Sequence, residues 1–208
     1  MKHLSLCLGL LAMLIGRGIP AAESTPAPAP AAATAPAAAH TGPPQVLVVT
    51  SVGSFTIQLN EERAPLTVAS FLKYVDDGQY TNTILHRVIA SFIVQGGGFD
   101  TNYKAKPAAR KTHNESGNGL SNVRGTVGLA RTSEPHSGDC QFYINLADNN
   151  ALDPSPTRWG YAVFGKVVQG MDVVDRIGAV STGAHGEFKE DVPMEMITIL
   201  RVERVKQP

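Results

Sequence analysis

The chain first shows a strand pattern at residues 45–50 (QVLVVT) and again at residues 54–59 (SFTIQL). Both stretches are short and rich in apolar, β-branched residues, which favour strands. Residues 51–53 (SVG) between them form a turn signal. The pattern predicts an antiparallel β-hairpin at the start of the folded region.

A helix follows the hairpin. Pro65 suits the first helical turn, where its missing N–H costs nothing. Gly78 fits just beyond the last turn, where a left-handed backbone is common. Apolar residues recur between them at i, i+3, i+4 and i+7: Val68, Phe71, Leu72 and Val75. This spacing predicts a helix with one buried face.

The rest of the domain is rich in short apolar segments separated by glycine-rich loops. Further strands are predicted at residues 84–88, 92–95, 126–130, 141–145, 161–167 and 194–205. A second, short helix is predicted at residues 171–177, after Gly170. Many strands with two helices indicate a mainly β fold, and we expect a closed antiparallel β-barrel capped by the helices.

The N-terminus differs in composition from the rest. Lys2 precedes an apolar run over residues 4–15, and small residues follow near Ala21. This is the layout of a secretory signal peptide, which we place at residues 1–22. Arg17 leaves the cleavage point approximate, and an uncleaved membrane tether stays open as the alternative.

Residues 23–44 are dominated by alanine and proline. Such a segment has little to bury and is expected to be a disordered, extended linker. The folded domain then spans residues 45–208, and Cys140 is its single cysteine. An internal disulfide is therefore excluded, and we expect Cys140 to pack as a small hydrophobic residue.

Charge and motifs exclude several function classes. The 18 basic and 18 acidic residues balance, which gives no electrostatic signature for nucleic acid or an anionic membrane. Hydrolase elbows, phosphate-binding loops and metal-ligand spacings are absent, so no cofactor or metal is predicted. His86 is expected to be a hydrogen-bonded core or loop residue rather than a ligand.

One arginine interrupts an otherwise apolar segment at residues 85–99 (LHRVIASFIVQGGGF). Burying the Arg87 cation without partners would be costly. Either Arg87 extends to solvent or pairs with a carboxylate, or it serves a site together with Phe92 and Gln95. The segment by itself does not decide between these two hypotheses for Arg87.

Two later clusters carry further candidates. In residues 140–145 (CQFYIN), Gln141 and Tyr143 lie two apart and should face the same side of a strand. The next cluster, residues 151–153 (ALD), is followed by an apolar strand at residues 161–167.

These three clusters resemble those of the cyclophilins, which are peptidyl-prolyl cis–trans isomerases, and their order is most similar to the exported bacterial branch. The resemblance covers residues 45–205. It implies an eight-stranded antiparallel barrel with two capping helices. It also implies acceleration of X–Pro isomerisation in proline-containing, incompletely folded exported polypeptides, without a cofactor.

The resemblance assigns roles to individual residues. The catalytic arginine of the family falls on Arg87, which would donate a hydrogen bond to the prolyl nitrogen in the twisted transition state, while Gln95 steadies Arg87 or the substrate carbonyl. The proline pocket would comprise Phe92, Ile93, Tyr143 and Leu152. The polar residues that hold the substrate backbone would be Gln95, Gln141, Ala130 and Arg131, the last two through main-chain groups.

Three positions depart from the common family pattern. Tyr161 takes the place of a pocket histidine, Ala151 replaces a tryptophan, and Tyr143 stands where phenylalanine is commoner. We therefore expect weak cyclosporin binding. Trp159 is expected to pack in the core rather than to substitute for the missing tryptophan.

The resemblance and the signal peptide together predict a periplasmic, monomeric folding catalyst. The alternative from another class is a non-enzymatic cyclophilin-like module that only binds proline-containing segments. Retention of Arg87 favours catalysis, because binding alone does not need a cation aimed at the prolyl nitrogen.

Overall fold

The computed structural model describes residues 42–206, and its first two strands form the expected hairpin. β1 (Gln45–Thr50) pairs antiparallel with β2 (Gly53–Leu59). The turn between them is closed by the Thr50 hydroxyl, which donates to the Gly53 carbonyl over 2.7 Å. The backbone of Gly53 has a φ of +138°, a value that side chains rarely allow.

The first helix also forms as predicted. α1 (Pro65–Asp76) has its proline in the first turn and buries the apolar face. Gly78 follows with a left-handed φ of +68°, which ends the helix. α2 (Met171–Gly178) confirms the second predicted helix, and η1 (Asn150–Leu152) is a short 3-10 turn.

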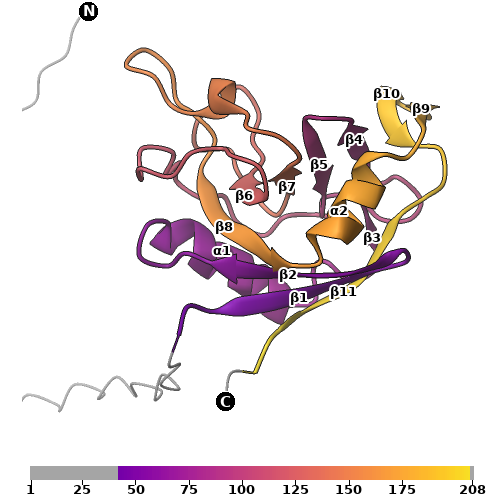
Figure 1. The fold of residues 1–208 in the computed structure, drawn as a ribbon, viewed down its shortest axis with the longest axis horizontal. Coiled ribbons are helices and arrows are strands. Elements are labelled where there is room, and N and C mark those ends of the chain that lie inside the picture. Colours follow the sequence, from indigo (N-terminus) through magenta and orange to yellow (C-terminus); the bar gives the residue numbers. More distant parts are fainter. Residues whose placement is uncertain (1–41, 207–208) are drawn as a thin grey trace, which may run out of the picture. The chain divides into compact units, whose positions relative to one another are not determined.

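Nine strands form one curled antiparallel sheet (Figure 1). Its order is β3-β11-β1-β2-β8-β6-β7-β5-β4. The remaining members are β3 (Thr83–Ile84), β4 (Arg87–Ile89), β5 (Ile93–Gly96), β6 (Thr126–Leu129), β7 (Phe142–Asn145), β8 (Val163–Gln169) and β11 (Thr198–Arg204). A separate two-stranded hairpin, β9 (Thr182–His185) and β10 (Phe188–Pro193), was not predicted from the sequence.

The predicted closed eight-stranded barrel is not what the described residues form. The single strand predicted at residues 84–88 is divided into β3 and β4, and these two pieces are the opposite edges of the sheet. The break comes at Leu85 and His86, although the Leu85 N–H still donates to the carbonyl of Ile197, the residue before β11. The two edge strands of the curled sheet, β3 and β4, are therefore consecutive in the chain. No strand pairing between β3 and β4 closes the sheet into a barrel.

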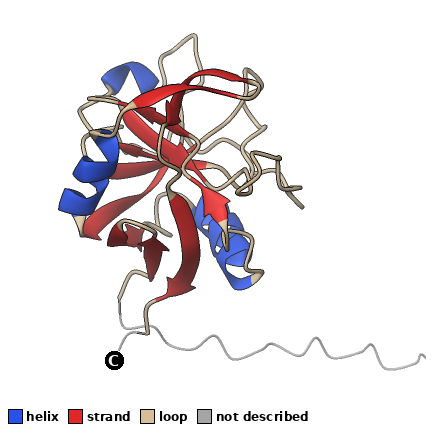
Figure 2. Ribbon diagram, turned by 90° about the vertical axis from the view of Figure 1, so that its right-hand side faces the viewer, coloured by secondary structure: helices blue, strands red, loops and turns tan. Residues whose placement is uncertain are grey.

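The core fills the concave side of this sheet. α1 and α2 both bury residues in the same apolar cluster, and Figure 2 shows helices on two sides of the strands. Phe71 of α1 contacts three other rings at centroid distances of 5.0–5.8 Å. Cys140 belongs to this cluster and is buried, as predicted.

The predicted signal peptide lies outside the described residues, and so does most of the predicted linker. Among residues 42–206, no helix is long and apolar enough to cross a membrane.

Candidate active site

Strands β4, β5 and β7 carry two faces of different chemistry. One face belongs to the core, where Val88, Val94 and Ile144 lie side by side. The other face carries the cross-strand row Arg87, Gln95 and Tyr143. Directly paired residues of antiparallel strands project to the same side. Neighbouring strands are about 4.8 Å apart, so the backbones of Arg87 and Tyr143 are separated by roughly 10 Å.

Arg87 is the first residue of this row and lies on β4, the edge strand of the sheet. Its side chain is 43% exposed, and its Nε donates to Oδ2 of Asp191 over 3.4 Å. Arg87 thus has a carboxylate partner, as one of the two hypotheses expected, and it also lies beside other candidate residues. Asp191 comes from β10, 104 positions later, and sequence patterns gave no sign of this contact.

Gln95, in the middle of the row, does not bond to Arg87. Its Nε2 donates instead to Oε1 of Gln141 over 3.2 Å. Gln141 precedes β7 on the same face as Tyr143, as the alternation predicted. Gly98 makes room for it, since a Cβ at position 98 would lie 2.4 Å from the Gln141 side chain. The two amides thus form a fixed polar pair beside the guanidinium.

Tyr143 is buried, and its hydroxyl donates to Oδ1 of Asn122 over 2.6 Å. Burial raises the pKa of this phenol well above its ordinary value, so it stays protonated. Asn122 is held in turn by Oδ1 of Asp153, which accepts from its N–H and from its Nδ2, both over 2.8 Å. Asn145 donates to the same Asn122 oxygen. Sequence patterns gave no sign of Asn122, because only the folded chain brings its loop to β7.

The apolar candidates lie beside the row: Ile93 precedes Gln95 by two positions on β5 and is paired with Asn145. Ile93 is buried, whereas Phe92 and Leu152 are half-buried. The carbonyl of Phe92 accepts from the N–H of Leu146 over 2.8 Å and from Nδ2 of Asn149 over 2.9 Å. These bonds fix the backbone from which the Phe92 ring projects.

Tyr161 and Arg131 extend the candidate site beyond Tyr143. The Tyr161 ring meets Tyr143 edge-on at a centroid distance of 6.0 Å. Cζ of Arg131 lies 4.4 Å from the centroid of the Tyr161 ring, a cation–π contact. The guanidinium of Arg131 also donates to the carbonyls of Gly160 and Trp159 over 3.1 and 2.7 Å. Its side chain is therefore occupied within the protein, which agrees with a main-chain role at this position.

One of the two main-chain groups of Ala130 is hydrogen-bonded within the protein. Its N–H donates to the Gln141 carbonyl over 2.9 Å, so this N–H is already satisfied within the protein.

Trp159 is not in the core, and that prediction was wrong. Trp159 is 48% exposed, and its ring meets His136 edge-on at a centroid distance of 5.2 Å. Trp159 directly follows a short surface turn, in which Ser155 and Arg158 exchange backbone hydrogen bonds. The next residue, Gly160, is buried against Pro154 with no space for a Cβ.

His86 is buried, as predicted, but its Nδ1 has no hydrogen-bond partner among the described residues. Burial lowers the pKa of His86 to about 4, and the Arg87 charge adds to this effect. The imidazole is therefore neutral at physiological pH. No group of three or more His, Cys, Asp or Glu side chains within residues 42–206 is arranged to hold a metal ion.

The sequence and the fold are similar to those of known proteins. The family model for cyclophilin type peptidyl-prolyl cis–trans isomerase matches residues 45–204, so the chain belongs to this family. It is 49% identical over 154 residues to a peptidyl-prolyl cis–trans isomerase of Acinetobacter baylyi, covering 74% of this chain and 81% of that protein. It is 47% identical over 157 residues to isomerase B of Escherichia coli, covering 72% and 96%. The chain is accordingly a peptidyl-prolyl cis–trans isomerase.

Two solved structures show that the fold is that of the cyclophilins. A cyclophilin of Cryptosporidium parvum superimposes with a TM-score of 0.66 at 22% identity, covering 80% of this chain and 100% of that one. A second structure, determined in the presence of the dipeptide Ala-Pro, gives 0.67 at 24% identity and covers 78% and 99%.

Proposed function

We propose that this isomerase acts on X–Pro bonds of exported, incompletely folded polypeptides, and that Arg87 donates a hydrogen bond to the prolyl nitrogen as the bond twists. The single observation that carries the proposal is the cross-strand row of Arg87, Gln95 and Tyr143. It puts a half-exposed guanidinium and a fixed amide on one face with an aromatic ring.

The chemistry requires no covalent step. Resonance keeps the X–Pro amide planar, and rotation must cross a barrier of roughly 18–20 kcal/mol. In the twisted state the prolyl nitrogen loses conjugation and regains a lone pair, which can then accept a hydrogen bond. A donor aimed at that nitrogen stabilises the transition state and not the planar ground state, and such differential binding is what accelerates a reaction.

Arg87 has the properties of this donor. Its guanidinium stays charged at all relevant pH values and presents several N–H groups in a rigid fork. Asp191 contacts Nε, so the terminal nitrogens remain for a substrate. A rate increase of about a thousand-fold needs only about 4 kcal/mol, within the reach of a charge-assisted hydrogen bond in a partly desolvated site.

The remaining candidates would hold the substrate. Phe92, Ile93 and Leu152 surround the position of the prolyl ring, with the ring of Tyr143 behind it. Gln95 and Gln141 are already paired with each other, which orients their free amide atoms toward a peptide backbone. The carbonyl of Ala130, the main chain of Arg131 and the ring of Tyr161 complete the far side.

An isomerisation assay on a short X–Pro peptide tests the role of Arg87. We expect Arg87→Ala to lower kcat/KM by at least about a hundred-fold, the loss of one charged donor. Arg201→Ala is the matched control, since Arg201 is an exposed arginine of β11 paired with Glu203. Equal rates for Arg87→Ala and the wild type would remove Arg87 from the mechanism. Peptide binding without acceleration by the wild type would favour the binding module.

Export is proposed from the sequence of residues 1–22 and is tested separately. The mature N-terminus should be found near Ala22 by mass spectrometry, and fractionation should release the protein with the soluble periplasm. Retention in the membrane fraction would support the uncleaved tether. Sedimentation should give a monomer.

Weak cyclosporin sensitivity is proposed from Ala151 and Tyr161. Inhibition at nanomolar concentrations would contradict it. Ala151→Trp should strengthen inhibition, because it adds a large apolar surface to the rim.

A further inference from the structure

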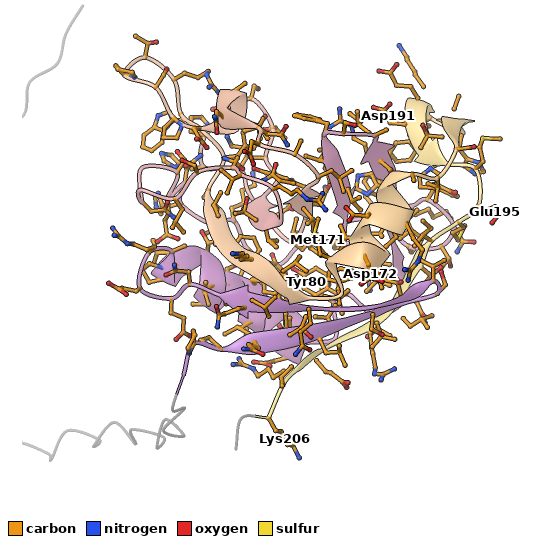
Figure 3. All side chains as sticks on the ribbon, in the orientation of Figure 1. Tyr80, Met171, Asp172, Asp191, Glu195 and Lys206 are labelled. Carbon is orange, nitrogen blue, oxygen red and sulfur yellow. The ribbon has the colours of Figure 1, made fainter. Side chains whose placement is uncertain are left out.

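The β9–β10 hairpin supplies the partner of the proposed catalytic arginine. It is not part of the nine-stranded sheet, and β10 passes beside β4 at the edge of that sheet (Figure 1). Asp191 is labelled on this hairpin in Figure 3. Its Oδ2 lies 3.4 Å from Nε of Arg87, and its side chain is 23% exposed.

The backbone of Asp191 is adapted to this contact. Its φ is +66°, in the left-handed region that aspartate and asparagine tolerate better than most residues. The pairing of β10 with β9 is interrupted between Phe188 and Val192, the stretch that includes Asp191. The residue therefore departs from the regular alternation of the strand.

Aromatic contacts hold the hairpin in place. Phe188 meets Phe99 edge-on at a centroid distance of 5.0 Å and lies 5.8 Å from the ring of His86, the residue before Arg87. On the other strand His185 stacks on Tyr103 at 3.9 Å. The carboxylate is thus carried by an anchored element rather than by a free loop.

The described polar side chains beside Arg87 do not hydrogen-bond to its guanidinium, with the exception of Asp191. Gln95, directly opposite Arg87 in the strand pair, donates from Nε2 to Gln141 and makes no hydrogen bond to Arg87 within residues 42–206. Within residues 42–206, Asp191 is the one hydrogen-bond partner of the Arg87 guanidinium. A single carboxylate on Nε restricts rotation of the arginine while its terminal nitrogens stay free.

We propose that Asp191 is a positioning residue, which acts through Arg87 by holding the guanidinium in the orientation that reaches the prolyl nitrogen. This inference rests on the proposed role of Arg87. It extends the site to a hairpin more than one hundred positions away in the chain.

Asp191→Asn is the informative variant, because asparagine keeps the shape and tolerates the left-handed backbone. We expect kcat for the X–Pro peptide to fall about five-fold, the range of a partly exposed ion pair, with KM unchanged. The thermal midpoint should match that of the wild type. Glu190→Gln is the control, since Glu190 is exposed on the same hairpin and has no ion pair with a described residue. An unchanged kcat for Asp191→Asn would overturn the proposal.

A double-mutant cycle separates positioning from a structural role. Arg87→Lys keeps a cation but lacks the Nε–H that Asp191 binds. In this background Asp191→Asn should cause no further loss, whereas a structural role would lower kcat again by the same factor and contradict the proposal. Failure of the mechanism itself has a different result, since Arg87→Ala would then match the wild type.

Discussion

The ring of Tyr143 lies directly over Gly128. The two residues are paired across β6 and β7, and a Cβ at position 128 would come within 2.3 Å of the tyrosine side chain. The absence of a side chain at Gly128 therefore leaves the space that the ring occupies. The hydroxyl at its end reaches Asn122, so the ring position is fixed from both sides.

Gly128→Ala should disturb both stability and activity. The added methyl group overfills a buried site, and we expect the free energy of unfolding to fall by about 1–3 kcal/mol in urea titrations. Displacement of Tyr143 should also lower kcat/KM roughly ten-fold or more. Gly117→Ala is the control, because nothing lies within 4 Å of a Cβ at that position. Unchanged stability of Gly128→Ala would show that the ring moves freely.

Tyr143→Phe should cost stability without abolishing catalysis. It removes the hydrogen bond to Asn122, whose oxygen still accepts from Asn145 over 3.2 Å. We expect a loss of about 1 kcal/mol in the free energy of unfolding, because one donor remains. Tyr161→Phe should change stability by less, since the Tyr161 hydroxyl has no bond to a described residue. Equal losses in the two variants would contradict this view of the network.

The neutral state of His86 predicts acid sensitivity. Its folded pKa of about 4 is below the ordinary value of 6.5, so the unfolded chain binds the proton more readily. The contribution to stability is present above pH 6.5 and is lost as pH falls toward 4. We expect a loss of about 2 kcal/mol between pH 7 and pH 5.

Urea titrations at the two pH values test this prediction, with His86→Gln and His113→Gln compared. The first variant should remove most of the pH dependence, and the second, at an exposed position, should keep it. The same slope in His86→Gln would assign the effect to other groups.

Cys140 should resist thiol reagents in the native protein. Burial raises its pKa to about 11, and the thiolate that reacts is scarce at pH 8. In a Cys7→Ser background, where Cys140 is the only thiol, labelling should be slow in buffer and rapid in urea. Rapid labelling of the native protein would reveal local opening around β7.

Local sequence patterns predicted most elements of the fold. β1, β2 and α1 follow from β-branched runs, a first-turn proline and regular apolar spacing, which act over a few residues. The β9–β10 hairpin was missed because its strands are polar and mostly exposed, with little apolar alternation to reveal them. Trp159 was placed wrongly because the apolar pattern does not show that it directly follows an exposed turn at residues 155–158.

The candidate site, too, was predictable from the sequence only in part. Alternation and the family resemblance identified Arg87, Gln95 and Tyr143, but pairing of separate strands was needed to put them in one row. The contact of Arg87 with Asp191 and that of Tyr143 with Asn122 were not predictable from either segment. Both join residues distant in the chain.

The sequence by itself determined the family, the kinds of elements and Arg87 as the candidate arginine, because periodicity and motif chemistry depend on neighbours along the chain. Only the tertiary structure decided that β3 and β4 are opposite edges of an open curled sheet. It also decided which carboxylate holds Arg87. These features depend on how distant segments pack, and the free energy of packing depends on the whole fold rather than on any one segment.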